Sequence, residues 1–268
     1  MKQYGKVGGF DSFFFQIRKR LKCFLILPLM VVTSCISIYF PNSQNLPTFT
    51  AAKEFQGSGQ AQIFMPPFAY SGQAQGAYSL TDHLSVMSNY AFARTLTYGK
   101  GQLGELGMGY YTNRNANYFG VFLGYGISSA FDNTNNFLLI FGNPTPDSIT
   151  TYNATDVKSN YRSLFLQPSY GIRGHRFSFV FSIKISRIDF DNTYYRNNFY
   201  PLESRSISYH FEPATTFKVK LGNSPFSFIS QCGIHFTNYD DASFMRNFGR
   251  IAVGLQWSLM PKKASTIK

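Results

Sequence analysis

The sequence predicts an all-β fold, a transmembrane antiparallel up-and-down β-barrel of about ten strands. Three observations predict it: alternation of apolar and polar residues over segments of about ten residues, an alternation of short and long connections, and an unusual composition. Aromatic residues make up 18% of the 268 residues and charged residues only 14%, whereas soluble domains carry about 25% charged residues. A wall between lipid and a polar interior has this composition.

The first 34 residues indicate a lipoprotein-type signal peptide. A basic cluster from Arg18 to Lys22 precedes an apolar run over 23–32. This run is too short for a transmembrane helix, which needs about 20 residues. The run ends in Val32-Thr33-Ser34-Cys35, and small residues before a cysteine predict acylation of Cys35. The alternatives are an ordinary signal peptide, or an uncleaved anchor, beside a coincidental cysteine.

Three segments follow the signal. Residues 35–54 have Pro and Asn but no period, so we expect a lipidated N-terminal tether. Residues 55–259 form the predicted outer-membrane barrel, and residues 260–268 form a C-terminal tail.

Period-two alternation is clearest over residues 206–221, where Ile207, Tyr209 and Phe211 alternate with polar residues. Eight strands would remain if 55–64 stayed outside the sheet, and twelve would form if 129–159 made its own hairpin. The ten strands that we predict cover residues 55–64, 69–80, 83–94, 102–112, 117–128, 160–172, 175–187, 206–221, 225–236 and 247–259.

The connections between these strands predict the orientation. Tight turns such as Thr81-Asp82 and Arg173-Gly174 alternate with longer connections such as 129–159 and 188–205. Short turns on one rim and long loops on the other are typical of bacterial outer-membrane barrels. We therefore expect both termini and the tight turns in the periplasm, with the long loops extracellular.

The predicted inward faces carry charged residues, five basic and two acidic. Because an unpaired buried charge costs several kcal/mol, we expect Glu105 and Glu212 to pair with some of the basic residues. The excess of basic residues predicts a basic lumen. This lumen charge network consists of Glu105, Arg176, Lys184, Glu212, Lys218, Lys220 and Arg250.

One strand face combines Ser208, His210 and Glu212, the residue types of a hydrolytic triad. Alternate side chains on a strand lie about 7 Å apart, beyond the hydrogen-bond reach that a nucleophile and its base require. We therefore predict a polar lining without catalysis. His235, expected across the barrel, could complete a pair with His210.

The remaining motifs predict no cofactor, metal or nucleic acid. No zinc spacing, phosphate-binding glycine loop or nucleotide motif occurs, and no run of Lys or Arg after residue 34 exceeds two. We interpret Asp189-Phe190-Asp191 and Asp240-Asp241 as solvated loop charges, since a calcium site needs more oxygen ligands. Cys232 has no predicted disulfide partner and suits a strand face.

Several short motifs resemble one family. Cys35 is followed by Tyr39-Phe40-Pro41-Asn42, then Asn45-Leu46-Pro47 and Glu54; further motifs are Tyr78 to Val86 and Phe211-Glu212-Pro213-Ala214. With these motifs the chain resembles the outer-membrane β-barrel lipoproteins of Bacteroidota, most of which have no assigned activity. Two features depart from that family: nine residues follow Leu259, and no acidic stretch follows Cys35. The second departure predicts a lipid in the periplasmic leaflet.

Together these observations predict a non-enzymatic outer-membrane protein with a structural role or a loop-mediated binding role. Its expected partners are outer-membrane lipid, the barrel-assembly machinery and an extracellular ligand at 129–159 and 188–205. A small pore for anionic solutes is one alternative, suggested by the basic lumen. A lipid-modifying enzyme that uses His210 or His235 is the other.

Overall fold

The structure is a computed structural model that describes residues 39, 41–65, 69–95, 99–141, 150–195, 201–237 and 247–260. The predictions for the signal peptide, for Cys35 and for Asp240-Asp241 lie outside these residues, as does the predicted tail beyond Met260. No helix among the described residues is long and apolar enough to cross a membrane.

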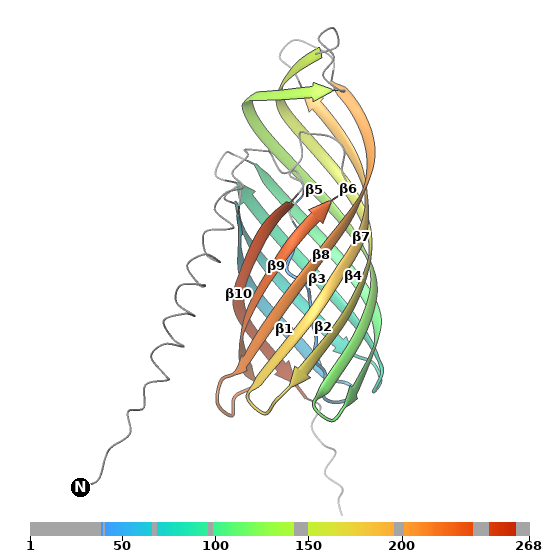
Figure 1. Cartoon of the computed structure of the whole chain (residues 1–268), viewed down its shortest axis with the longest axis vertical. Coiled ribbons are helices and arrows are strands. Elements are labelled where there is room, and N and C mark those ends of the chain that lie inside the picture. The colour runs from blue at the N-terminus through green and yellow to red at the C-terminus, as the bar shows by residue number, and fades with distance from the viewer. Residues whose placement is uncertain are drawn as a thin grey trace, which may run out of the picture. The chain divides into compact units, whose positions relative to one another are not determined.

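Ten antiparallel strands form one closed barrel, which confirms the predicted fold class (Figure 1). Each strand pairs with its neighbours in sequence, and the barrel closes where β1 pairs with β10, from Phe55 opposite Leu259 to Met65 opposite Gly249. The strands are β1 (Phe55–Met65), β2 (Ala69–Ser79), β3 (Leu84–Thr95), β4 (Lys100–Arg114), β5 (Asn117–Phe141), β6 (Thr150–Arg173), β7 (Phe177–Tyr195), β8 (Leu202–Lys220), β9 (Phe226–Thr237) and β10 (Asn247–Leu259).

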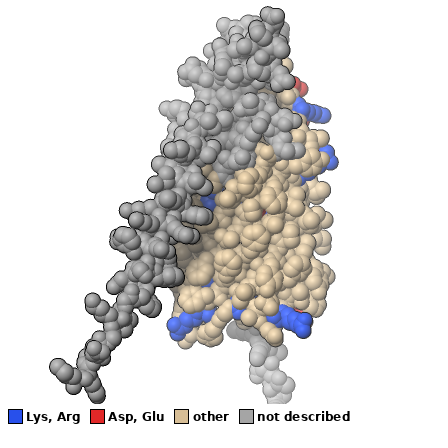
Figure 2. Space-filling view, in the orientation of Figure 1, with Lys and Arg blue, Asp and Glu red and all other residues tan. Residues whose placement is uncertain are grey.

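The strands alternate between an apolar outer face and a polar inner face. On β7, Phe177, Phe179 and Phe181 are exposed, whereas Ser182 and Lys184 are buried. Figure 2 shows a broad band of mostly uncharged side chains above a row of Lys and Arg at the rim of the tight turns. An apolar outer band around a closed sheet suits a hydrocarbon environment, in which every backbone polar group must be paired.

Two of the expected long loops are mostly strand. Beyond Phe131 of β5 and Asp156 of β6, these two strands pair only with each other, and they continue to Phe141 and Thr150. Residues 137–141 therefore lengthen β5 instead of adding strands, and the twelve-strand alternative is wrong.

The connection expected at 188–205 is shortened in the same way, because β7 and β8 pair as far as Tyr194 opposite Leu202. We call these two projections the extended hairpins. At the opposite rim the turns are tight, and Gly222, between β8 and β9, has a φ of 62°, which favours glycine.

Candidate functional site in the barrel lumen

The N-terminal segment, expected as a tether, lies inside the barrel. Every residue from Pro41 to Phe49 is buried, without secondary structure. We call residues 41–49 the plug. Its hydrogen-bond partners lie on nine of the strands: β1, β2, β3, β4, β6, β7, β8, β9 and β10.

The plug runs from the extended hairpins to the tight turns. Just before it, the ring of Tyr39 lies 5.5 Å from the ring of Tyr161 and 4.6 Å from that of His210. At its other end, the Phe49 carbonyl accepts hydrogen bonds from Asn113 and Arg173, both at 2.9 Å and both beside tight turns. The chain therefore enters the lumen at the end of the extended hairpins, whereas its N-terminal side was expected at the end of the tight turns.

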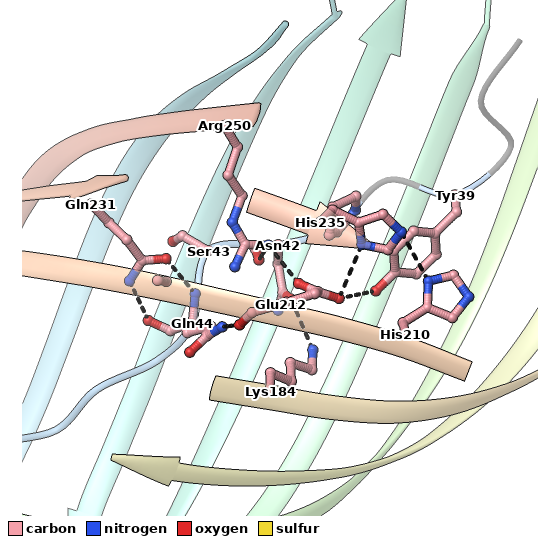
Figure 3. A network of polar contacts seen from close by, with 12 residues as sticks. Tyr39, Asn42, Ser43, Gln44, Lys184, His210, Glu212, Gln231, His235 and Arg250 are labelled. Atoms are coloured by element: carbon pink, nitrogen blue, oxygen red, sulfur yellow. Dashed lines mark hydrogen bonds and ion pairs between the residues drawn. The ribbon is translucent and has the colours of Figure 1, made fainter. Parts of the chain in front are cut away.

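Asn42 of the plug lies between two buried ion pairs, Lys184–Glu105 and Arg250–Glu212. Figure 3 shows Asn42 beside Lys184, Glu212 and Arg250. The side-chain amide of Asn42 donates to Glu105 at 2.7 Å, and its Oδ1 accepts from Lys184 at 3.3 Å, while Lys184 and Glu105 also contact each other. The Asn42 carbonyl accepts from Arg250 at 2.8 Å. The same Arg250 nitrogen lies 2.7 Å from Glu212, so one plug residue connects both pairs.

Of the seven residues in the predicted charge network, Glu105, Lys184, Glu212 and Arg250 form these two pairs. Lys218 is buried and donates to the Leu46 carbonyl of the plug at 2.5 Å. Arg176 and Lys220 lie exposed at the tight-turn rim and not in the lumen, because Arg176 directly precedes β7 and Lys220 is the last residue of β8.

The expectation of a basic lumen is therefore wrong. Buried charges balance among the described residues, with three acidic and three basic side chains. They are Glu54, Glu105, Glu212, Lys184, Lys218 and Arg250.

Glutamine and serine side chains satisfy the backbone of the plug. Gln44 and Gln231 bond reciprocally: the Gln44 N–H donates to Gln231 at 2.8 Å, and the Gln231 amide donates to the Gln44 carbonyl at 3.1 Å. The Gln75 amide donates to the Ser43 carbonyl at 2.8 Å. Since an unpaired buried backbone group costs about as much as a lost hydrogen bond, these contacts let an irregular segment remain in a buried interior.

A chain of hydrogen bonds links the histidines. Ser208 Oγ and His210 Nε2 are 2.5 Å apart, and His210 Nδ1 lies 3.0 Å from His235 Nε2. The expectation that Ser208 and His210 lie beyond hydrogen-bond reach is wrong. The spacing of about 7 Å separates backbone positions, while long side chains lean along the strand.

Glu212 stands at the end of this chain without completing a triad. His235 Nδ1 lies 3.6 Å from Glu212 Oε1, too far for a hydrogen bond. The same oxygen accepts a hydrogen bond from the Tyr39 hydroxyl at 2.8 Å. Ser208 is 0% exposed, so the arrangement holds a potential nucleophile and base inside a filled lumen.

The structure adds no metal centre. Among the residues it describes, no group of three or more His, Cys, Asp or Glu side chains is placed to hold an ion. Asp189 and Asp191 instead pair with Arg187 at 3.2 Å and Arg205 at 2.8 Å. Cys232 is free and exposed on β9.

No family model matches the chain, and no curated protein matches it by sequence. Among solved structures, the outer-membrane protease OmpT from Escherichia coli aligns with a TM-score of 0.50 at 10% identity, over 79% of this chain and 99% of that one. The β domain of the Bordetella autotransporter BrkA aligns with a TM-score of 0.44 at 10% identity, over 78% and 100%. The translocator domain of NalP from Neisseria meningitidis aligns with a TM-score of 0.44 at 8% identity, over 76% and 87%. The chain has the fold of outer-membrane β-barrels.

Proposed function

We propose that the protein is a non-enzymatic, non-conducting outer-membrane barrel that has a structural role or binds a ligand at its extended hairpins. The observation that carries this proposal is the plug, nine consecutive buried residues of the chain's own N-terminal segment inside the lumen. The tight turns face the periplasm and the extended hairpins face outward in this proposal. The apolar wall contacts outer-membrane lipid, and the barrel-assembly machinery inserts the chain.

The anionic pore is the less favoured alternative because the plug and the balanced charges leave no continuous basic path among the described residues. Purified protein in planar bilayers should show no conductance steps. A variant that lacks residues 39–50 should conduct, provided that its heat-modifiable gel mobility shows a folded barrel. Regular conductance by the unmodified protein would contradict the proposal.

The hydrogen-bonded Ser208, His210 and His235 favour a second candidate, a lipid-modifying hydrolase with Ser208 as nucleophile and His210 as base. A fluorophosphonate probe tests it. The hydrolase would be labelled, and labelling would be lost in Ser208→Ala and kept in Ser186→Ala, whose serine is equally buried and lies opposite His210. The non-enzymatic proposal expects no labelling of any of the three.

Acylation of Cys35, and with it membership of the Bacteroidota lipoproteins, belongs to the proposal. Tyr39 lies at the hairpin end of the lumen, and four residues span at most about 14 Å. We therefore propose that an acyl chain on Cys35 inserts on the hairpin side of the membrane rather than in the periplasmic leaflet. Palmitate labelling lost in Cys35→Ala, and antibody access on intact cells to an epitope inserted after Ser37, would support this topology. Access only after permeabilisation would contradict it.

A further inference from the structure

A cavity of about 530 Å³ opens at the tight-turn rim. Its wall comes from the β6–β7 turn, the end of β8, the β8–β9 turn and the end of β10, and Thr48 of the plug contributes to its lining. We call it the vestibule. Its volume lies within the range of about 300–1,000 Å³ that is typical of small-molecule sites.

The vestibule is lined by four cationic side chains, Arg173, Arg176, Lys218 and Lys220, and by one carboxylate. None of the four forms an ion pair with a described carboxylate. This differs from the two ion pairs deeper in the lumen. A concave site lined by one sign of charge concentrates the field and attracts ions of opposite sign.

The single carboxylate in the wall, Glu54, is occupied by neighbouring groups. Its Oε2 accepts hydrogen bonds from the Thr50 N–H at 2.6 Å and the Thr50 hydroxyl at 2.8 Å, and its Oε1 accepts from Gln56 at 2.7 Å. These contacts hold the carboxylate beside the chain that follows the plug. It therefore offsets only part of the positive charge.

The cations differ in what holds them. Arg173 and Lys218 donate to the plug carbonyls of Phe49 and Leu46, whereas the side chains of Arg176 and Lys220 are exposed and form no ion pair with the described part of the chain. The first pair fixes the inner part of the site, and the second pair is available to a ligand. Because plug carbonyls orient the inner cations, the site is complete only in the plugged barrel.

We propose that the vestibule binds a multiply charged phosphate-bearing group from the periplasmic side. Arginine presents several N–H donors that match phosphate oxygens, and several clustered cations suit more than one negative charge. Serine hydroxyls at Ser178 and Ser227 add neutral donors along the wall. The group could belong to a soluble phosphate or to a lipid headgroup. Only the side of approach rests on the orientation proposed above; the binding itself does not depend on whether the barrel conducts or catalyses.

Isothermal titration calorimetry on the full chain in a maltoside detergent tests the proposal with two probes, inorganic pyrophosphate and short-chain phosphatidic acid. We expect saturable binding that weakens at least about tenfold in the double variant Arg176→Gln/Lys220→Gln, which removes two charge-assisted contacts. The control Lys53→Gln/Arg114→Gln removes two exposed charges that do not line the vestibule. Its affinity should stay within about twofold of the unmodified protein.

The two probes separate the sources of phosphate. Binding of pyrophosphate assigns a soluble ligand, and binding of phosphatidic acid alone assigns a lipid headgroup. No saturable binding of either probe would overturn the proposal, as would an equal loss in both double variants. Heat-modifiable gel mobility confirms that each variant is a folded barrel, so that lost binding is not lost structure.

Discussion

Removing one partner of the buried Glu212–Arg250 pair should destabilise the barrel far more than removing one partner of an exposed pair of nearly equal length. The pair is 2.7 Å long, and its side chains are 0% and 1% exposed. Glu212→Leu leaves the Arg250 charge buried beside Asn42 without its carboxylate. We expect a loss of about 3–5 kcal/mol in the free energy of unfolding, the usual cost of an uncompensated buried charge.

The exposed pair Arg205–Asp191 serves as the matched control. Its length is 2.8 Å, and its side chains are 89% and 52% exposed. Water screens such a pair, so Asp191→Asn should cost no more than about 1 kcal/mol. Urea unfolding from phospholipid vesicles measures both losses, with Trp257, the only tryptophan of the sequence, as the fluorescent reporter.

The double variant Glu212→Leu/Arg250→Met completes the test. It removes both buried charges, and Nε and Nη2 of Arg250 have no hydrogen-bond partner to lose among the described groups. The double variant should therefore lose about 1–3 kcal/mol less than the sum of the single variants. If the losses of the two single variants add to that of the double variant within about 0.5 kcal/mol, the pairing is refuted. A loss for Glu212→Leu as small as that of Asp191→Asn would also refute it.

Two further predictions concern barrel closure and the plug. Gly254→Ala should lower the free energy of unfolding by about 1–3 kcal/mol in the same assay, or block assembly, because the new Cβ would lie 2.1 Å from the Gly59 carbonyl across the β1–β10 seam. Gly59→Ala, the control, has open space around it and should change the free energy of unfolding by no more than about 0.5 kcal/mol. Equal effects of the two alanines would contradict closure of the barrel at this seam. Asn42→Ala should cost about 1–3 kcal/mol, because Glu105 and Lys184 each lose a buried polar partner. A loss under about 0.5 kcal/mol would mean that Asn42 does not lie between the pairs.

The barrel wall could be predicted from the sequence because the patterns that define it involve residues that lie close together in the chain. Alternation of apolar and polar residues along a strand such as β7 indicates which residues face lipid. Tight turns such as Arg173-Gly174 indicate which strands are neighbours. The predicted strand starts and ends differ most at β5 and β6. The sequence indicated boundaries near 128 and 160, whereas the pairing of β5 with β6 continues to Phe141 and Thr150. Two antiparallel strands can pair with each other beyond the barrel rim without a third strand beside them.

The plug could not be predicted in this way, because its partners are distant in sequence and its conformation has no period. Asn42 bonds to Glu105, 63 positions away, and its carbonyl accepts from Arg250, 208 positions away. One signal was available. Several inward residues of β1 and β2, among them Gln60 and Gln75, carry amides that need partners, and the segment 42–45, Asn-Ser-Gln-Asn, supplies them.

The lumen charges were partly predictable for a similar reason. Period two placed Lys184 and Glu212 on inward faces, but it also placed Arg176 and Lys220 there. Alternation fixes the side of the sheet and not the depth along the barrel axis, so residues at strand ends reach the rim instead of the core. The vestibule at that rim was missed because it is assembled from two turns, the ends of distant strands and the plug.

The position of the plug is tested most directly by cross-linking it to the barrel wall. In a chain whose native cysteines are replaced by serine, cysteines at Ser43 and Gln75 should be joined by a short bismaleimide, because both side chains are buried and in contact. The control pairs Ser43 with Ala74, the adjacent β2 residue, which faces outward. We expect cross-linking of the first pair and not of the second in the folded barrel. Equal cross-linking of both pairs, or of neither, would contradict a plugged lumen.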